Sequence, residues 1–352
     1  MTGRMGTNMS ARRNISLIMA ALTVLLCSAC TELEEPDNGW KELAGDAPMF
    51  FSTSIAATKA TTPYPANTSF GVFAFYQPNG TWNSSRKPNF MYNEEVVYNG
   101  STYSYAPVRY WPSNDENKIS FWAYSPYSAN PDLLKVNTTT AYTSNTNNIP
   151  DIRFEVDGQT DLMASAIVKD KTYSNCTTPG VVSFTFNHLL SLIEFTVEKV
   201  DPNDDYTVTL TSISFENIYN TGIYKNSNST WNIGNTTPRQ SLPAFSGSQT
   251  VITTEASVWE DPSDPVTPVT VMPLPQTLVS TTARLCIEYT LSWDGGITPR
   301  TNTCYCPITE DWVKNKHYIY HITITPNMPI EFTISSVNWT DWGDANNYHL
   351  TS

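Results

Sequence analysis

The sequence is short of charge, and above all of positive charge. Charged side chains make up 15% of the 352 residues, and 20 Lys and Arg against 33 Asp and Glu give a formal net charge of −13. Nucleic-acid binding requires a basic surface to meet the phosphates, so this balance excludes a nucleic-acid partner. Disorder is excluded as the main state, because aromatic residues reach 12% and can bury ample apolar surface.

Helix-forming residues are scarce as well. Ala, Glu, Lys and Leu are few beside Thr, Ser, Asn, Tyr and Val, which favour strands and turns. No stretch of the mature chain sustains an apolar period of 3.6 residues. We therefore expect an all-β protein.

Sequence signatures of catalysis are missing too. The chain has no GxSxG, GxGxxG or GxxxxGK motif, and its four histidines show neither HExxH nor HxH spacing. His188, beside a Phe-Thr-Phe run, is expected to be a core or turn histidine. A glycosidase needs only two carboxylates at the right separation, and such a pair has no sequence motif of its own. On balance we expect no catalytic residue, no metal ion and no cofactor.

The first 29 residues have the layout of an export signal. Arg4, Arg12 and Arg13 form a positive region, and an almost unbroken apolar run follows over residues 15–26. This run is shorter than the about 20 residues that a membrane span requires. An ordinary signal peptide or a buried hydrophobic helix is the alternative.

The end of this segment looks like a bacterial lipobox. Residues 26–30 read Leu-Cys-Ser-Ala-Cys. The resemblance implies that residues 1–29 are cleaved off and that Cys30 carries a lipid, which holds the protein at the outer membrane. A lipoprotein anchor has more than one acyl chain, which suffices for stable attachment. Residues 30–48 then form an acidic tether that resembles the surface-export signals of Bacteroidetes-type lipoproteins.

Four cysteines remain in the mature chain: Cys176, Cys286, Cys304 and Cys306. Cys286 and Cys304 flank a predicted hairpin centred on residues 294–296. A cross-strand disulfide from Cys286 to Cys304 or to Cys306 is possible if the register allows it. Otherwise these are buried or half-buried thiols. No second Cys or His pair completes a zinc site.

Short apolar runs alternate with turn-rich stretches along the rest of the chain. Residues 70–76 are apolar at nearly every position, which predicts a central strand. Alternation over 182–186 and 193–198 predicts two strands joined by a tight connection. Further strands are expected at 49–55, 103–105, 108–112, 119–126, 206–215, 222–224, 231–233, 269–274, 284–293, 303–308, 317–325 and 330–339, and loops at 128–150 and 255–268.

An Asp-rich turn at residues 201–205 is the expected domain boundary. It splits the chain near its middle, so two β-sandwiches in series fit better than one barrel. We expect an N-terminal β-sandwich over residues 49–200 and a C-terminal β-sandwich over residues 201–352. A phase change within residues 206–215 also predicts a β-bulge.

A set of short segments keeps one order along nearly the whole mature chain. In order, they are Thr58-Lys59-Ala60, Gly71-Val72-Phe73-Ala74, Tyr110-Trp111-Pro112, residues 119–126, Asp161-Leu162-Met163-Ala164-Ser165-Ala166, residues 184–191, Trp312, residues 316–320 and Val337-Asn338-Trp339. None is specific alone, but together they resemble the fimbrillin-like (type V pilin) family of Bacteroidetes. The resemblance implies two tandem transthyretin-like, Greek-key β-sandwich domains, export as a lipoprotein, and non-catalytic assembly into fimbriae at the outer membrane.

The resemblance also implies polymerisation by strand exchange with other fimbrial subunits. An Arg/Lys-specific protease removes the first strand, and a terminal strand of the next subunit fills the groove. In this chain the removed strand is 49–55, and cleavage falls between Lys59 and Ala60, where the family more often has Arg. The donor strand comes from residues 330–350, with these apolar positions: Ile330, Phe332, Ile334 and Val337.

Other interpretations stay open at this point. Residues 56–68 could be merely a connecting loop, and residues 330–350 merely the last strand of their own sandwich. Trp122, Tyr124 and Tyr127 could stack on sugars in a monomeric carbohydrate-binding surface lipoprotein, or belong to the core. Within the family, the chain could be a stalk, tip or membrane-anchor subunit, and its further partner a host glycan or a protein receptor.

Overall fold

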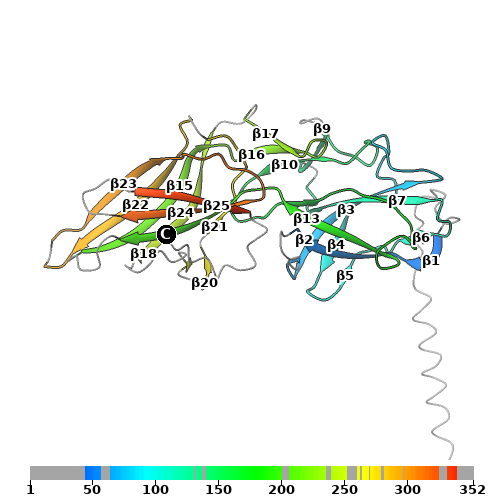
Figure 1. The fold of residues 1–352 in the computed structure, drawn as a ribbon, viewed down its shortest axis with the longest axis horizontal. Coiled ribbons are helices and arrows are strands. Elements are labelled where there is room, and N and C mark those ends of the chain that lie inside the picture. Colours follow the sequence, from blue (N-terminus) through cyan, green and yellow to red (C-terminus); the bar gives the residue numbers. More distant parts are fainter. Residues whose placement is uncertain are drawn as a thin grey trace, which may run out of the picture. The chain divides into compact units, whose positions relative to one another are not determined.

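The computed structural model describes residues 44–56, 64–130, 132–136, 140–199, 206–234, 239–251, 260–261, 264–268, 270–278, 281–295, 297–324 and 331–338. The chain divides into two compact units, Met1–Ala44 and Gly45–Ser352, and nearly all of these residues belong to the second. Regular secondary structure in these ranges consists of β-strands (Figure 1), so the predicted all-β class is confirmed. None of the described residues forms an apolar helix long enough to cross a membrane.

The strands follow one another along the chain with short connections. The first thirteen described are β1 (Ala44–Pro48), β2 (Phe50–Ile55), β3 (Thr68–Gln77), β4 (Met91–Tyr98), β5 (Tyr103–Ser104), β6 (Tyr110–Pro112), β7 (Lys118–Ser125), β8 (Leu134–Val136), β9 (Thr140–Ala141), β10 (Asp151–Glu155), β11 (Met163–Ser165), β12 (Val168–Lys171) and β13 (Val181–His188). They are followed by β14 (Leu192–Lys199), β15 (Tyr206–Ile218), β16 (Thr221–Lys225), β17 (Thr230–Ile233), β18 (Gln240–Val251), β19 (Glu260–Asp261), β20 (Asp264–Pro268), β21 (Thr270–Val271), β22 (Arg284–Trp293), β23 (Arg300–Pro307), β24 (Lys316–Ile324) and β25 (Glu331–Asn338).

The largest sheet has the order β2-β13-β11-β7-β3-β4-β5, and β12 also pairs with β7. β3 lies inside it, between β7 and β4, and every side chain from Phe70 to Gln77 is buried. The central strand predicted from residues 70–76 is therefore confirmed. β2 lies at the edge of this sheet and pairs in parallel with β13 (Figure 1).

The chain leaves this sheet between β13 and β14. Along β13, buried Val182, Phe184 and Phe186 alternate with exposed residues, as predicted. β14 pairs in parallel with β24 and antiparallel with β21 instead. The change of sheet thus occurs at residues 189–191, ahead of the turn at 201–205, which lies outside the described residues. The division into two domains at that turn stays a prediction.

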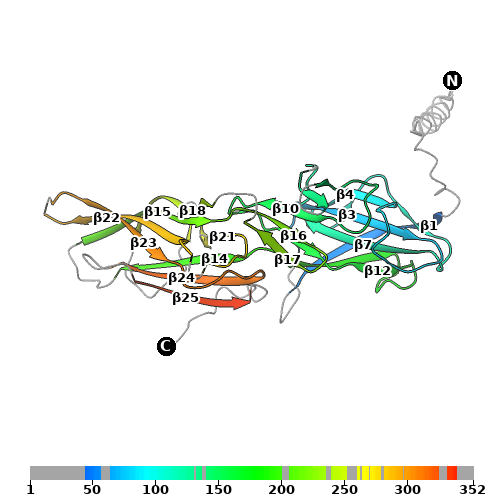
Figure 2. The same ribbon diagram turned by 90° about the horizontal axis from the view of Figure 1, so that it is seen from above.

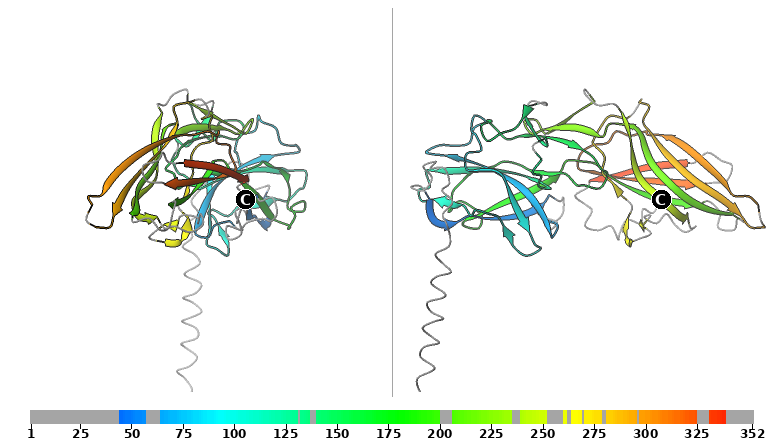
Figure 3. Two further views of the ribbon diagram at one scale, coloured as in Figure 1. Left: turned by 60° about the vertical axis from the view of Figure 1, so that its left-hand side comes forward. Right: turned by 180° about the vertical axis from the view of Figure 1, so that it is seen from behind.

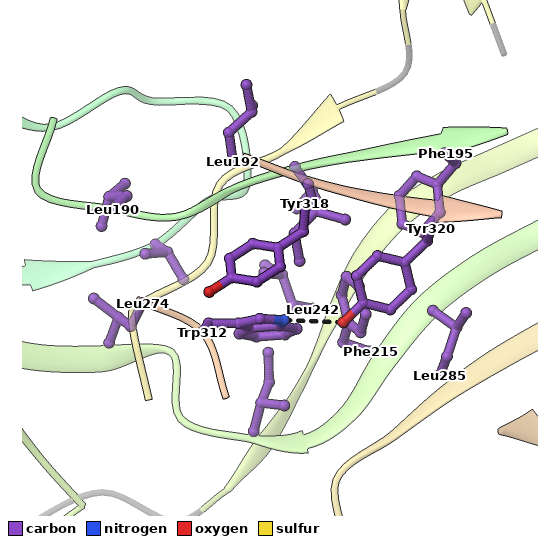
Figure 4. Close-up of a cluster of buried hydrophobic side chains, with 14 of the residues drawn as sticks. Leu190, Leu192, Phe195, Phe215, Leu242, Leu274, Leu285, Trp312, Tyr318 and Tyr320 are labelled. Carbon is purple, nitrogen blue, oxygen red and sulfur yellow. Dashed lines mark hydrogen bonds between the residues drawn. The ribbon is translucent and has the colours of Figure 1, made fainter. Parts of the chain in front are cut away.

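Two four-stranded sheets, β21-β14-β24-β25 and β18-β15-β22-β23, face each other in two layers (Figures 2 and 3). The ring centroid of Phe215 in β15 lies 6.0 Å from that of Phe195 in β14 and 5.7 Å from that of Tyr320 in β24. Trp312 Nε1 donates to the Tyr320 hydroxyl at 3.0 Å (Figure 4). Burial raises the pKa of Tyr320. This hydrogen bond lets two large polar-tipped rings remain in an apolar core.

A five-stranded sheet, β17-β16-β10-β8-β9, combines strands from distant parts of the sequence. The strands predicted at residues 222–224 and 231–233 are confirmed, and they pair as a hairpin in which Gly222 of β16 lies opposite Ile233 of β17. β10 pairs antiparallel with β16, and Lys225 forms a 2.7 Å ion pair with Asp151. Backbone hydrogen bonds therefore link residues near 150 to residues near 220.

Some details of the strands match the sequence-based expectations and others differ. The bulge predicted in β15 is confirmed by a register shift between Leu210 and Ser212. Both segments predicted to be loops contain strands, namely β8 and β9 within 128–150, and β19 and β20 within 255–268. These strands have two to five residues, too few to show a period in the sequence.

The register of the predicted hairpin β22–β23 excludes the disulfide considered above. Cys286 lies opposite Tyr305, so Cys304 and Cys306 flank its partner residue. Since neighbouring side chains of a strand point to opposite faces, both thiols lie across the sheet from Cys286. All four described cysteines are free. The disulfide that the sequence left open, from Cys286 to Cys304 or Cys306, is therefore excluded, and the alternative of buried or half-buried thiols is confirmed.

Candidate functional site

β2 is an edge strand that buries its apolar residues on one face. Residues Phe50 to Ile55 pair in parallel, without a register shift, with Val181 to Phe186 of β13. Phe51 and Ile55 are buried, whereas Phe50 is 52% exposed. Ser52, Thr53 and Ser54, between Phe51 and Ile55, are half-buried. Phe51 and Ile55 are four residues apart, so both side chains lie on the same face of the strand. The strand predicted over residues 49–55 is confirmed as β2. It is not the first strand, because residues 44–48, which were expected to belong to the tether, form β1 and pair with β6.

An aromatic cluster holds the inner face of β2. The Phe51 ring stacks on Phe184 of β13 with 5.8 Å between centroids. It also meets the rings of Tyr105 at 5.1 Å, Phe121 at 6.4 Å and Phe70 at 6.5 Å at steep angles. Phe70 and Phe121 belong to β3 and β7, which pair with each other and not with β2. The slot that receives Phe51 is thus built by strands that do not depend on β2 for their pairing.

Side chains and a loop close the outer edge of β2. The Thr53 amide donates to the Tyr103 hydroxyl at 3.2 Å, and the Tyr105 hydroxyl donates to the Met49 carbonyl at 2.9 Å. The Met49 amide donates to the carbonyl of Arg109 at 2.8 Å. Burial raises the pKa of Tyr105, so its hydroxyl keeps its proton and can donate. Among the described residues, no second strand pairs with β2.

β25, in the segment predicted to donate a strand, is also an edge strand. It pairs antiparallel with β24, from Lys316–Asn338 to Thr323–Glu331, at the end of its sheet. Three proposed donor residues have register partners in β24: Phe332 lies opposite Ile322, Ile334 opposite Tyr320, and Val337 opposite His317. In this chain β25 thus completes its own sheet, which was the alternative interpretation.

The other residues expected to act in assembly lie outside the described ranges. These are Cys30 at the lipid anchor, Lys59 and Ala60 at the cleavage point, and Ile330. Their roles stay predictions. The predicted cleavage point falls between Ala56, one residue after β2, and Tyr64, where the described residues begin again.

The sequence candidates for other functions belong to the core. Trp122 and Tyr124 are fully buried, so the core interpretation is confirmed for these two, whereas Tyr127 is half-buried. His188 is 7% exposed, and its Nδ1 lies 2.8 Å from Oδ2 of Asp161. The expected structural role of His188 is confirmed.

The sequence-based reasoning missed the tyrosines that close the edge of β2. Tyr103 lies 50 residues from Thr53 along the chain, and Tyr105 lies 56 residues from Met49. Both tyrosines were assigned to a strand of their own. No local pattern signals a contact over such a separation, because it depends on how the sheet closes.

Comparisons with known proteins agree with this fold. A fimbrium subunit, Fim1C of Phocaeicola vulgatus, is 30% identical over 235 residues, which are 62% of this chain and 61% of that protein. The chain thus matches about three fifths of the length of that relative. A crystal structure of a fimbrial protein from Bacteroides vulgatus has a TM-score of 0.63 at 22% identity, covering 83% of this chain and 99% of that one. Residues 58–342 match the fimbrillin-like family model, so this chain belongs to the fimbrillin-like family.

Proposed function

We propose that this protein is a structural subunit of cell-surface fimbriae that polymerises by strand exchange and supports adhesion. Family membership and the similarity to Fim1C support a place in a fimbrium. The observation that carries the mechanism is the edge strand β2, whose Phe51 and Ile55 fill a slot built by other strands. The role is structural and requires no catalytic group.

Cleavage between Lys59 and Ala60 would sever β2 from β3 without removing it. The ladder to β13 and the contacts of Phe51 would hold the cut strand until another strand displaces it. Its departure leaves the backbone groups of β13 unpaired at a sheet edge and exposes the rings of Phe70 and Phe184. An incoming strand with alternating apolar residues restores both kinds of contact.

The donor strand in this proposal is β25 of the next subunit. As an edge strand, β25 can leave β24 without opening the interior of its sheet. Its sequence offers Phe332 and Ile334 two residues apart, a spacing that places both side chains on one face of an extended strand. Phe332 and Ile334 would fill the slot that Phe51 leaves when β2 departs.

Cleavage at Lys59 would also determine whether a subunit enters the fibre or stays at the outer membrane. It separates the folded chain from Cys30 and its lipid, so that a cleaved subunit passes into the fibre. An uncleaved subunit keeps its lipid at the outer membrane and would act as the anchor. At the surface, a host glycan or a protein receptor is the proposed partner for adhesion.

Gel ladders of the native surface fraction test the cleavage step. Subunits joined by exchanged strands resist detergent, so the natural chain is expected to give a ladder of multimers in unheated samples. Lys59→Ala is expected to leave a single monomer band. Lys87→Ala, at an exposed lysine outside the described contacts of β2, is the matched control and should keep the ladder. An undiminished ladder in Lys59→Ala would contradict cleavage at this bond.

A further inference from the structure

A cavity of about 470 Å³ lies near the carboxyl end of β13, beside the turn that joins β16 to β17. Its walls come from β7, from residues 164–169, from the end of β13, from the β16–β17 turn, and from the segment just before β24. Its volume is in the range of sites that hold small organic molecules. No residue of β2 or β25 lines it, so a ligand here would not compete with strand exchange.

The charge of the cavity is opposite to the charge of the chain. The protein carries 33 acidic against 20 basic side chains, yet the described residues that line the cavity include Lys169, Lys314 and His188 and no carboxylate. Oδ2 of Asp161, outside the lining, lies 2.8 Å from Nδ1 of His188. The excess positive charge therefore belongs to the two lysines.

Neither lysine is neutralised within the part of the chain that the structure describes. Lys314 Nζ donates to the carbonyl of Ser229 at 2.8 Å and to the hydroxyl of Tyr224 at 3.2 Å, and both acceptors are uncharged. Lys169 is exposed, and the ion pairs of the described residues include neither lysine. Two uncompensated ammonium groups at one cavity favour an anionic ligand.

The remaining lining is rich in groups that bind hydroxyls. The amides of Asn187, Asn226 and Asn315 contribute donors and acceptors. Among the described residues, two buried polar atoms of the lining, Oδ1 of Asn315 and Nε1 of Trp122, have no hydrogen-bond partner. Buried polar atoms are nearly always paired, so these two make the wall of the cavity unusually polar.

We propose that this cavity binds an acidic monosaccharide, such as a uronic acid or a sialic acid. The lysines meet its carboxylate, and the asparagine amides meet its hydroxyls. A bare inorganic anion would use the charge and bring no hydroxyls to the asparagine side chains. A neutral sugar would leave the two lysines without a counter-charge. The proposal goes beyond fimbrial assembly and gives the folded subunit a ligand of its own.

Titration of the full folded chain with sugars, followed by saturation-transfer NMR, tests this site. D-glucuronate and N-acetylneuraminate are the probes, with D-glucose as the neutral match and inorganic phosphate as the bare anion. We expect at least one acid to bind about tenfold more tightly than glucose, since a charge-assisted contact is lost in the neutral sugar. Excess phosphate should not displace it.

Variants at the two lysines identify the site. Lys169→Gln/Lys314→Gln should weaken binding of the acid about tenfold or more, and Lys87→Gln, a control at an exposed lysine outside the lining, should not change it. Lys169→Gln alone removes an exposed charge without disturbing packing, and a several-fold loss is expected. The proposal is overturned if neither acid binds, if phosphate displaces the acid fully, or if both lysine variants bind as the natural chain does.

Discussion

Phe50 and Phe51 are adjacent, yet one is half exposed and the other is almost fully buried against four rings. Phe51→Ala should lower the free energy of unfolding by about 3–5 kcal/mol, because it deletes a packed aromatic side chain. Phe50→Ala, its matched control, should change it by no more than about 0.5 kcal/mol. Urea unfolding of the uncleaved chain measures both. Equal losses would contradict the burial of one face of β2.

The cysteines yield a second prediction at this scale. Burial raises the pKa of Cys306 to about 11 and also raises that of Cys286. The thiolate is the reactive form, so at pH 8 both should react slowly with iodoacetamide in the folded chain and quickly in urea. Raising the pH toward 11 should speed the reaction of Cys306. Peptide mass mapping measures the labelling, and a disulfide-linked peptide containing Cys286 would contradict the register of β22 and β23.

At the scale of elements, β3 shows how closely the largest sheet is packed. A Cβ added at Gly71 would collide with the ring of Tyr124 and come within 2.8 Å of Asn93 Oδ1. The Tyr124 hydroxyl donates to that same Oδ1 at 2.8 Å. Gly71→Ala should therefore displace Tyr124 and cost about 1–3 kcal/mol of stability.

A glycine outside this sheet supplies the control for Gly71→Ala. Gly80 lies in a turn, and a Cβ there would meet the end of the Arg86 side chain at 3.3 Å, which can move aside. Thermal unfolding monitored by circular dichroism should show a clear drop in the midpoint for Gly71→Ala and little change for Gly80→Ala. Similar midpoints for both variants would contradict the close approach of β3 and Tyr124.

The elements that could be predicted are those with a strong local pattern. β3 is apolar throughout, β13 alternates, and β22 is bounded by clear turns, so each was predicted within a few residues. β4 was missed, since its central Asn-Glu-Glu breaks the apolar period. Sheet order, the parallel pairing of β2 with β13, and the passage of β14 to another sheet depend on long-range contacts, which no local pattern encodes.

At the scale of the whole molecule, the order of short motifs along the chain indicated the family, which no single residue could do. It led to the fimbrillin-like family, which the family match establishes. The groove that receives β2 could be predicted only from the resemblance to this family, which implied a removable first strand. The rings of Phe70, Phe121 and Phe184 that surround Phe51 come from three strands, and only the folded sheet brings them together.

The central claim is that the mature subunit loses β2 and is completed by another subunit. The N-terminus of the native surface protein tests it most directly, by intact mass together with Edman or peptide mass analysis. The account predicts a chain that begins at Ala60, without Cys30 and without β2. A chain that begins at a lipidated Cys30, with the tether and β2 still attached, would contradict the proposed assembly and leave an anchor subunit or a plain surface lipoprotein.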